Sequence, residues 1–221
     1  MKFVTFTSGR QVEPALGAFT EAEDAVVDLQ AVHARIAGEE HPGLRSMQDL
    51  IESYAHHGRA LALQCLDSAE PAECVPRAEA RLLAPLPTPI QIRDCLCFEE
   101  HLLGVMEAVS RMTGQAPSEG QQAMLRTFRQ QPLYYKANRF SVVGPDVEVR
   151  WPAYSQMMDY ELELGLVIGR TGSNIARDEA KEYIFGYTIF NDLSARDVQM
   201  PEMEGRLGPG KSKDFDGGNI L

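Results

Sequence analysis

The sequence predicts an α+β fold in which a small N-terminal subdomain is followed by a mainly β region. Two changes of composition along the 221 residues carry this prediction. Residues 83–89 read LAPLPTP, and three prolines at alternate positions fix φ and favour an extended connector. From Phe140 onward, short β-rich runs are separated by Gly and Pro. We therefore expect an N-terminal subdomain over residues 1–84 and a second domain over residues 85–221.

The expected elements follow from local composition. In the subdomain, residues 3–6 (FVTF) are typical of a strand and residues 46–60 of helix. After the connector, residues 94–108 are expected to turn helical and residues 113–131 to form a polar loop containing Gly and Pro. The strands expected in the second region are 141–145, 147–149, 160–168 and 183–190, with a short capped helix over 174–182.

Charge and hydropathy exclude several classes of partner. The chain carries 32 acidic and 21 basic residues, a formal net charge of −11. This balance argues against a nucleic acid or an anionic membrane as partner, and favours small molecules or cations. No apolar run reaches the length of a membrane span, and the start MKFVTFTSGR lacks the apolar core of a signal peptide. We therefore expect a cytoplasmic protein.

The four cysteines argue against a zinc ribbon or a redox motif. Cys65, Cys74, Cys95 and Cys97 show no C-x-x-C spacing. Since buried cysteine usually behaves as a small hydrophobic residue, we expect all four to be reduced.

Residues 205–212 read GRLGPGKS and match the phosphate-loop pattern G-x-x-x-x-G-K-[ST]. Such a loop needs a buried strand before it and a helix after it. Here the preceding residues, QMPEME, are no buried strand, and the following KDFDGG is poor in helix formers. Pro209 also removes one N–H from the loop. A nucleotide-binding protein stays as the alternative that this motif alone would support.

The stretch DYELELGLVI contains a pair of carboxylates at strand spacing. In an extended strand Glu161 and Glu163 point to one face, with Cα atoms about 7 Å apart, and Leu162, Leu164 and Leu166 to the other. Both carboxylates can then converge on one hard cation. The same pattern also fits the wet face of an antiparallel sheet.

Other candidate groups occur at strand and helix ends. Asp192 closes the apolar run IFND, where it can be either a ligand or a helix cap. Asp94 and His101 add a carboxylate and an imidazole, and Lys211 adds a cation. Oxygen donors without clustered His or Cys suit Mg²⁺ or Ca²⁺ rather than zinc.

Together these motifs resemble the fumarylacetoacetate hydrolase family. The resemblance runs from Asp94 to Ser212 through D-x6-H, E-L-E-L, Y-I-F-G-Y-T-I-F-N-D-L-S-A-R-D-V-Q and G-K-S, in that order. It implies the mixed β-roll of that family for the second domain. Carried over by position, it also implies a set of roles: metal ligands Asp94, Glu161, Glu163 and Asp192, catalytic His101 (general base) and Lys211 (beside the metal), and substrate contacts Tyr135 and Gln199.

The resemblance further implies a dimeric, metal-dependent enzyme with Mg²⁺, Ca²⁺ or Mn²⁺ as cofactor and a small keto acid as substrate. The expected reaction is hydrolysis of a C–C bond in a β-diketo acid or acylpyruvate, through an enolate that the metal stabilises. Isomerisation and decarboxylation are the alternatives within the family. A metal-binding module without turnover is the alternative outside it.

Some positions depart from the family pattern. Short members carry a glutamate three residues after the histidine, where this chain has Gly104. Either Glu100 or Glu107 takes its place, or the group lies in a segment beyond Leu221, where we expect the domain to continue. Positions that hold substrate-contacting tyrosines in fumarylacetoacetate hydrolases are Leu96 and Met203 here, which argues against that substrate.

Overall fold

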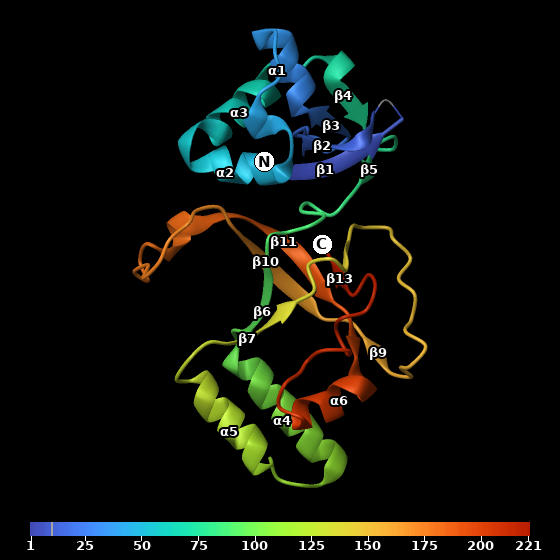
Figure 1. Ribbon diagram of the computed structural model, residues 1–221, viewed down its shortest axis with the longest axis vertical. Coiled ribbons are helices and arrows are strands. Elements are labelled where there is room, and N and C mark those ends of the chain that lie inside the picture. Colours follow the sequence, from blue (N-terminus) through green and yellow to red (C-terminus); the bar gives the residue numbers. More distant parts are fainter. Residues whose placement is uncertain (10) are drawn as a thin grey trace. The chain divides into compact units, whose positions relative to one another are not determined.

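A five-stranded antiparallel sheet organises the first 82 residues of the computed structural model, which describes residues 1–9 and 11–221 (Figure 1). In spatial order its strands are β4 (Cys74–Pro76), β3 (Ala25–Asp28), β2 (Gln11–Phe19), β1 (Phe3–Ser8) and β5 (Arg81–Leu82). The strand expected over residues 3–6 is confirmed. Phe6, Leu16 and Val26 are buried in this sheet.

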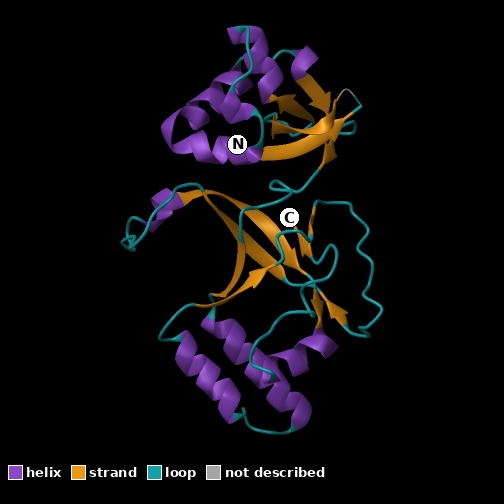
Figure 2. Cartoon of the chain, in the orientation of Figure 1, coloured by secondary structure: helices purple, strands orange, loops and turns teal. Residues whose placement is uncertain are grey.

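Helices cover the core side of this sheet (Figure 2). They are α1 (Leu29–Ala37), α2 (Met47–Ser53) and α3 (Arg59–Asp67), with the short helices η1 (Pro42–Leu44), η2 (Tyr54–Gly58) and η3 (Pro71–Glu73) between and after them. Leu16 and Val27 from the strands pack with Val32, Leu44 and Leu50 in one apolar cluster. The helix expected over residues 46–60 is confirmed, and the helical segment continues to Asp67.

The chain forms two compact units, Met1–Pro89 with Arg139–Leu221, and Ile90–Asn138. The proline-rich residues 83–89 contain neither helix nor strand, as their composition predicts. The Thr5 hydroxyl donates to the Pro85 carbonyl at 2.7 Å, which ties the connector to β1. The domain boundary expected after residue 84 stays a prediction.

The second unit is a strand pair with two helices. β6 (Ile92–Leu96) and β7 (Leu133–Ala137) are antiparallel, and α4 (Glu99–Thr113) and α5 (Glu119–Phe128) lie between them in sequence. The helix expected over 94–108 therefore begins only at Glu99, because residues 92–96 pair as a strand. The loop expected over 113–131 contains α5, since Ser118 caps that helix in a reciprocal hydrogen-bonded box with Gln121.

The rest of the first unit carries a mixed sheet. Its strands, in spatial order, are β10 (Leu162–Ile168), β11 (Ile184–Asp192), β13 (Asn219–Ile220) and β8 (Val142–Val143). β10 and β11 are antiparallel, with Glu163 opposite Phe190, whereas β13 and β8 are parallel. A second pair joins β9 (Met158–Asp159) to β12 (Ser194–Ala195), after which α6 (Arg196–Glu204) begins. The predicted α+β class is confirmed.

Two further expectations in this region are wrong. Residues 147–149 form no strand, and the helix expected over 174–182 is reduced to η4 (Ala180–Tyr183). Residues 174–179 are all exposed, and a short helix needs an apolar face that packs against a neighbour. In the part of the chain that the structure describes, every helix is too short or too polar to cross a bilayer.

The alternation expected along β10 is confirmed, but the buried face is not the apolar one. Leu162, Leu164, Leu166 and Ile168 are 50–74% exposed, while the intervening residues are partly buried. Tyr187 and Ile189 of β11 lie opposite Leu166 and Leu164 and are also exposed. One face of this strand pair is therefore apolar and open, and the carboxylates lie on the other.

Candidate metal centre

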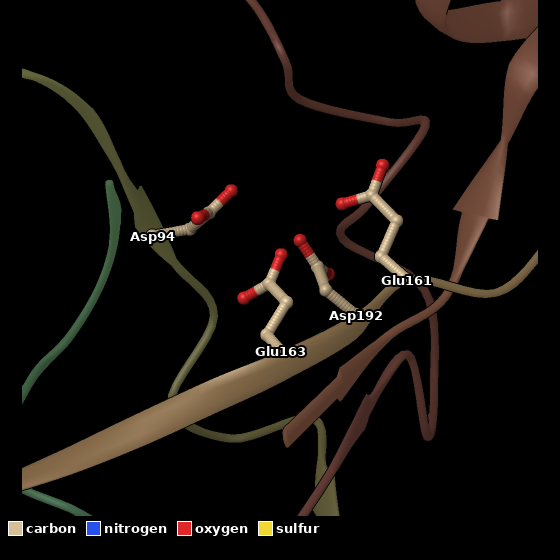
Figure 3. Close-up of side chains that lie close together, drawn as sticks. All are labelled: Asp94, Glu161, Glu163 and Asp192. Atoms are coloured by element: carbon tan, nitrogen blue, oxygen red, sulfur yellow. The ribbon is translucent and has the colours of Figure 1, made fainter. Parts of the chain in front are cut away.

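The register of β10 and β11 brings three of the predicted ligands together. Glu161 and Glu163 alternate onto the same face, and Asp192 ends β11 on the neighbouring strand. The Asp192 amide donates to the Glu161 carbonyl at 3.1 Å, which fixes the relative position of the two residues. Each of the three side chains offers a carboxylate oxygen, and these oxygens lie within 4.8 Å of one another (Figure 3). Oxygen donors at this spacing fit a hard divalent cation.

The other predicted site residues belong largely to the second unit. Asp94, the fourth ligand of the predicted set and also labelled in Figure 3, lies on β6 opposite Tyr135 of β7. His101 is exposed in the first turn of α4, and Glu100 is exposed beside it. Glu107 forms an ion pair with Arg111 at 3.5 Å. Of the two carboxylates considered as partners of His101, Glu107 is thus the one already paired.

Lys213 is a site residue that the sequence reasoning missed. Its side chain is 4% exposed, and its Nζ lies 2.8 Å from Glu161 Oε2 and 2.7 Å from Asp192 Oδ2. It also donates to the Asp192 carbonyl at 3.3 Å. The carboxylates of buried Asp192 and partly buried Glu161 therefore hold a buried ammonium, which compensates part of their charge.

Lys211, the lysine predicted to lie beside the metal, is exposed. Its Nζ lies 4.1 Å from the centre of the Tyr154 ring, and the Tyr154 hydroxyl donates to the Lys211 carbonyl at 2.8 Å. Lys211 and Lys213 flank Ser212 alike, so their sequence context does not favour Lys213, and the G-K-S motif contains Lys211.

Arg196 links the carboxylates to a predicted substrate contact. Its guanidinium forms ion pairs with Glu161 at 2.5 Å and with Asp159 at 2.8 Å, and donates to Gln199 Oε1 at 2.9 Å. The Gln199 carboxamide is thereby oriented from the first turn of α6. Burial would raise the pKa of Glu161, but Lys213 and then Arg196 outweigh it and hold that pKa below its usual value. Glu161 is therefore ionised at neutral pH.

The structural context of the GRLGPGKS segment is not that of a phosphate loop. It follows helix α6 rather than a strand, and turns and bends occupy residues 211–217 where a phosphate loop continues into a helix. The Gly208–Pro209 peptide bond is cis. Nucleotide binding thus gains no support from the fold.

Comparisons with known proteins identify relatives of this chain. The family model described as fumarylacetoacetate (FAA) hydrolase C-terminal matches residues 94–221. The mitochondrial oxaloacetate tautomerase fahd2 of Xenopus laevis is 28% identical over 200 residues, which are 90% of this chain and 54% of that protein. The chain thus spans about half the length of such curated relatives. The cytoplasmic location expected above stays a prediction.

Solved structures show the same fold. Fumarylacetoacetate hydrolase from Exiguobacterium antarcticum superposes with a TM-score of 0.63 at 20% identity, over 99% of this chain and 64% of that one. Maleylpyruvate hydrolase from Sphingobium sp. SYK-6, in complex with manganese(II) and pyruvate, gives 0.61 at 18% identity, over 100% and 64%. Because the family model covers more than half of the chain, the protein belongs to the fumarylacetoacetate hydrolase family.

Proposed function

We propose that this chain is a divalent-metal-dependent enzyme that hydrolyses a C–C bond in a β-diketo acid or acylpyruvate. The observation that carries the proposal is the convergence of Glu161, Glu163 and Asp192 on one face of β10 and β11, with Lys213 among them. Membership of the family supports it, since members named above include hydrolases of such acids.

The donor set fits Mg²⁺, Mn²⁺ or Ca²⁺. Glu161, Glu163 and Asp192 would hold the ion through carboxylate oxygens, and we propose Asp94 of β6 as the fourth ligand. When bound, the ion would polarise the oxygens of a dicarbonyl substrate and lower the cost of negative charge there. The relative crystallised with manganese(II) and pyruvate supports Mn²⁺ as one choice.

We assign the remaining roles to residues of this chain. His101 would accept a proton from water, so that hydroxide attacks the substrate carbonyl. Glu100, the carboxylate nearest to His101 in sequence, would be its partner. The Lys213 ammonium, held at the carboxylates, would offset negative charge that develops on the substrate. Arg196 would orient the Gln199 carboxamide toward the substrate, and the Tyr135 hydroxyl would contact the substrate. The catalytic role predicted for Lys211 stays a prediction.

A second reaction, keto–enol tautomerisation of oxaloacetate, is favoured by one comparison. Relatives that match 90% of this chain are named oxaloacetate tautomerases. Tautomerisation needs only proton transfer between carbon and oxygen, so the same base and the same charged groups would serve it. It differs from hydrolysis in releasing no second product.

The deciding experiment is a substrate screen with Mn²⁺ or Mg²⁺ present. Acylpyruvates, fumarylacetoacetate and oxaloacetate would be assayed for cleavage, tautomerisation and decarboxylation, alongside His101→Ala and the control His57→Ala, an exposed histidine of η2. We expect cleavage of an acylpyruvate, a loss of at least about 100-fold in His101→Ala, and an unchanged rate in the control.

Other results would redirect the proposal. Tautomerisation of oxaloacetate without turnover of any other substrate would replace hydrolysis by the tautomerase function. Tight Mn²⁺ binding without turnover of any substrate would identify an inactive binding module. Specific ATP binding in the same preparation would revive the nucleotide-binding alternative, which the hydrolase proposal excludes.

A further inference from the structure

The segment after α6 folds back onto a carboxylate of that helix. The amides of Gly210 and Ser212 both donate to Glu202 Oε2, each at 3.1 Å. Burial would raise the pKa of Glu202, but the hydrogen bonds from residues 210–212 outweigh it and hold that pKa below its usual value. At neutral pH an ionised carboxylate of the protein itself therefore receives these amides.

This arrangement accounts for Gly208 of the GRLGPGKS motif. Converging amides of a glycine-rich segment form an anion-binding concavity, and in this protein the Glu202 carboxylate lies where such a segment would accept an external anion. A Cβ at Gly208 would lie 2.9 Å from Glu202 Cβ, so a larger residue there would push the side chain away. The motif thus serves an internal anion.

The Ser212 residue is anchored at both of its backbone polar groups. Its N–H donates to Glu202, and its carbonyl accepts from the Ala195 amide at 2.9 Å. Ala195 belongs to β12, which pairs with β9 beside the carboxylates. The next residue, Lys213, donates its amide to the Gly210 carbonyl at 2.9 Å. These contacts fix the backbone from which the Lys213 side chain reaches Glu161 and Asp192.

We propose that Glu202 is a positioning residue: its carboxylate holds residues 208–213 in the conformation that places the Lys213 ammonium at Glu161 and Asp192. Glu202 acts only through Lys213. The consequence for metal binding rests on the function proposed above, whereas the consequence for the position of Lys213 does not.

Loss of this positioning should change the affinity for a divalent cation in one direction only. The Lys213 ammonium is a positive charge at carboxylates that would hold a divalent cation, and like charges in a buried site repel. If Lys213 is released, the affinity for a divalent cation should rise. General damage to the site would instead lower that affinity, because the ligands would be less well placed.

The first test measures the position of Lys213 without any metal. Brief treatment with an amine-acetylating reagent, followed by mass spectrometry, reports which lysines are accessible. In the wild type, Lys213 should be protected and Lys211 modified, since their side chains are buried and exposed. In Glu202→Ala, we expect modification of Lys213 to rise at least about tenfold, with Lys211 unchanged as the internal reference.

Two matched variants control this measurement. Glu202→Gln keeps an oxygen that can accept both amides, so Lys213 should stay mostly protected. Glu204→Ala removes an exposed carboxylate from the same helix end and should behave as the wild type. Protection of Lys213 that persists in Glu202→Ala overturns the proposal, and so does equal loss of protection in Glu204→Ala.

The second test measures Mn²⁺ affinity by calorimetry. Glu202→Ala should bind Mn²⁺ about three- to tenfold more tightly than the wild type, with Glu202→Gln close to the wild type. Because Glu202 acts through Lys213, Glu202→Ala should add nothing in a Lys213→Met background. Weaker binding in Glu202→Ala, or a further change in the double variant, contradicts the proposal.

Failure of the two proposals can be told apart. If neither the wild type nor any variant binds Mn²⁺, the proposed function is wrong, and the acetylation result alone decides the role of Glu202. If Mn²⁺ binds but Lys213 is equally protected in every variant, the function stands and the positioning role is wrong.

Discussion

Lys213 and Asp192 form an ion pair in which both side chains are buried, 4% and 0% exposed, with Nζ 2.7 Å from Oδ2. A buried pair of this kind is costly to break at one side, since the remaining charge loses its partner and stays out of water. The Lys211 ammonium, two residues earlier, lies against the ring of exposed Tyr154. The two lysines of one loop should therefore contribute very differently to stability.

We expect Lys213→Met to destabilise the metal-free protein by about 3–5 kcal/mol, and Lys211→Met by less than about 1 kcal/mol. Urea unfolding followed by circular dichroism measures both. Mn²⁺ should restore part of the loss in Lys213→Met, because a cation that binds only the folded state stabilises it. Equal stability of the two variants would show that the buried pair contributes no more than an exposed contact.

Local sequence pattern predicts that the carboxylates share a face, but it does not place Lys213 beside them. Strand alternation at Glu161 and Glu163 is a local property, and Asp192 follows an apolar run that had to be a strand. The position of Lys213 depends on contacts of Ser212 with Glu202 and Ala195, which are distant in the chain or on another element. No local pattern encodes such contacts, so the choice between Lys211 and Lys213 needed the fold.

The errors in secondary structure have similar origins. Residues 92–96 gave no clear strand signal alone and become a strand by pairing with β7. Gly114, Pro117 and Gly120 are typical of a loop and obscure the helix signal of α5. Ser118 and Gln121 nevertheless form the capping box that starts this helix. The open leucine face of β10 was unexpected because alternation predicts which residues share a face, but not which face is covered.

The exposed leucine face is consistent with the homodimer that the family resemblance implies. The homodimer itself stays a proposal. It consists of Leu162, Leu164, Leu166, Ile168, Tyr187 and Ile189, which are 50–74% exposed. These six apolar side chains are neighbours on one face of the β10–β11 pair, and a contiguous exposed apolar patch is typical of an interaction surface. We therefore expect a second copy to cover it.

Leu164→Asp should convert this dimer into a monomer at micromolar concentration, because a charge would be buried at the centre of the interface. Analytical ultracentrifugation of the wild type and the variant tests this. Val12→Asp is the control, since Val12 of β2 is apolar and 87% exposed but lies outside the face. A wild type that is monomeric at every concentration would exclude a second copy as the occupant.

The thiols should differ strongly in reactivity. Cys65 is fully buried in the N-terminal core, and burial raises the pKa of its thiol to about 11, whereas Cys95 and Cys97 are exposed. At pH 8 only roughly one Cys65 thiol in a thousand is then ionised, and a thiolate is the reactive species. Ellman's reagent should thus modify Cys95 and Cys97 in a fast phase and Cys65 only after urea unfolding. Cys97→Ser should remove one thiol from the fast phase; fast modification of Cys65 in the folded protein would contradict its burial.

The ion pair of Arg35 with Glu73 should make the stability of the N-terminal subdomain depend on pH. The hydrogen bond from Arg35 is the main cause that lowers the pKa of Glu73 below its usual 4.5. A carboxyl whose pKa is lower in the folded state stabilises the fold above the unfolded pKa, and the contribution is lost as the pH falls through the folded pKa. The Glu73 contribution is therefore complete at pH 7 and decreases below pH 4.5.

Glu73→Gln removes the charge but keeps the shape of the side chain. We expect it to be less stable than the wild type at pH 7, and the difference to shrink as the pH falls below about 4.5, because the wild type then loses its ionised carboxylate. Urea unfolding at pH 7, 5, 4 and 3 gives the comparison, with exposed Glu79→Gln from the same subdomain as control. The Glu73 side chain is only 8% exposed and also accepts from the Glu70 amide at 2.9 Å, so its ionised form has close partners in the folded state. A difference that stays constant from pH 7 to pH 3 would mean that Glu73 acts through its shape and not through its charge.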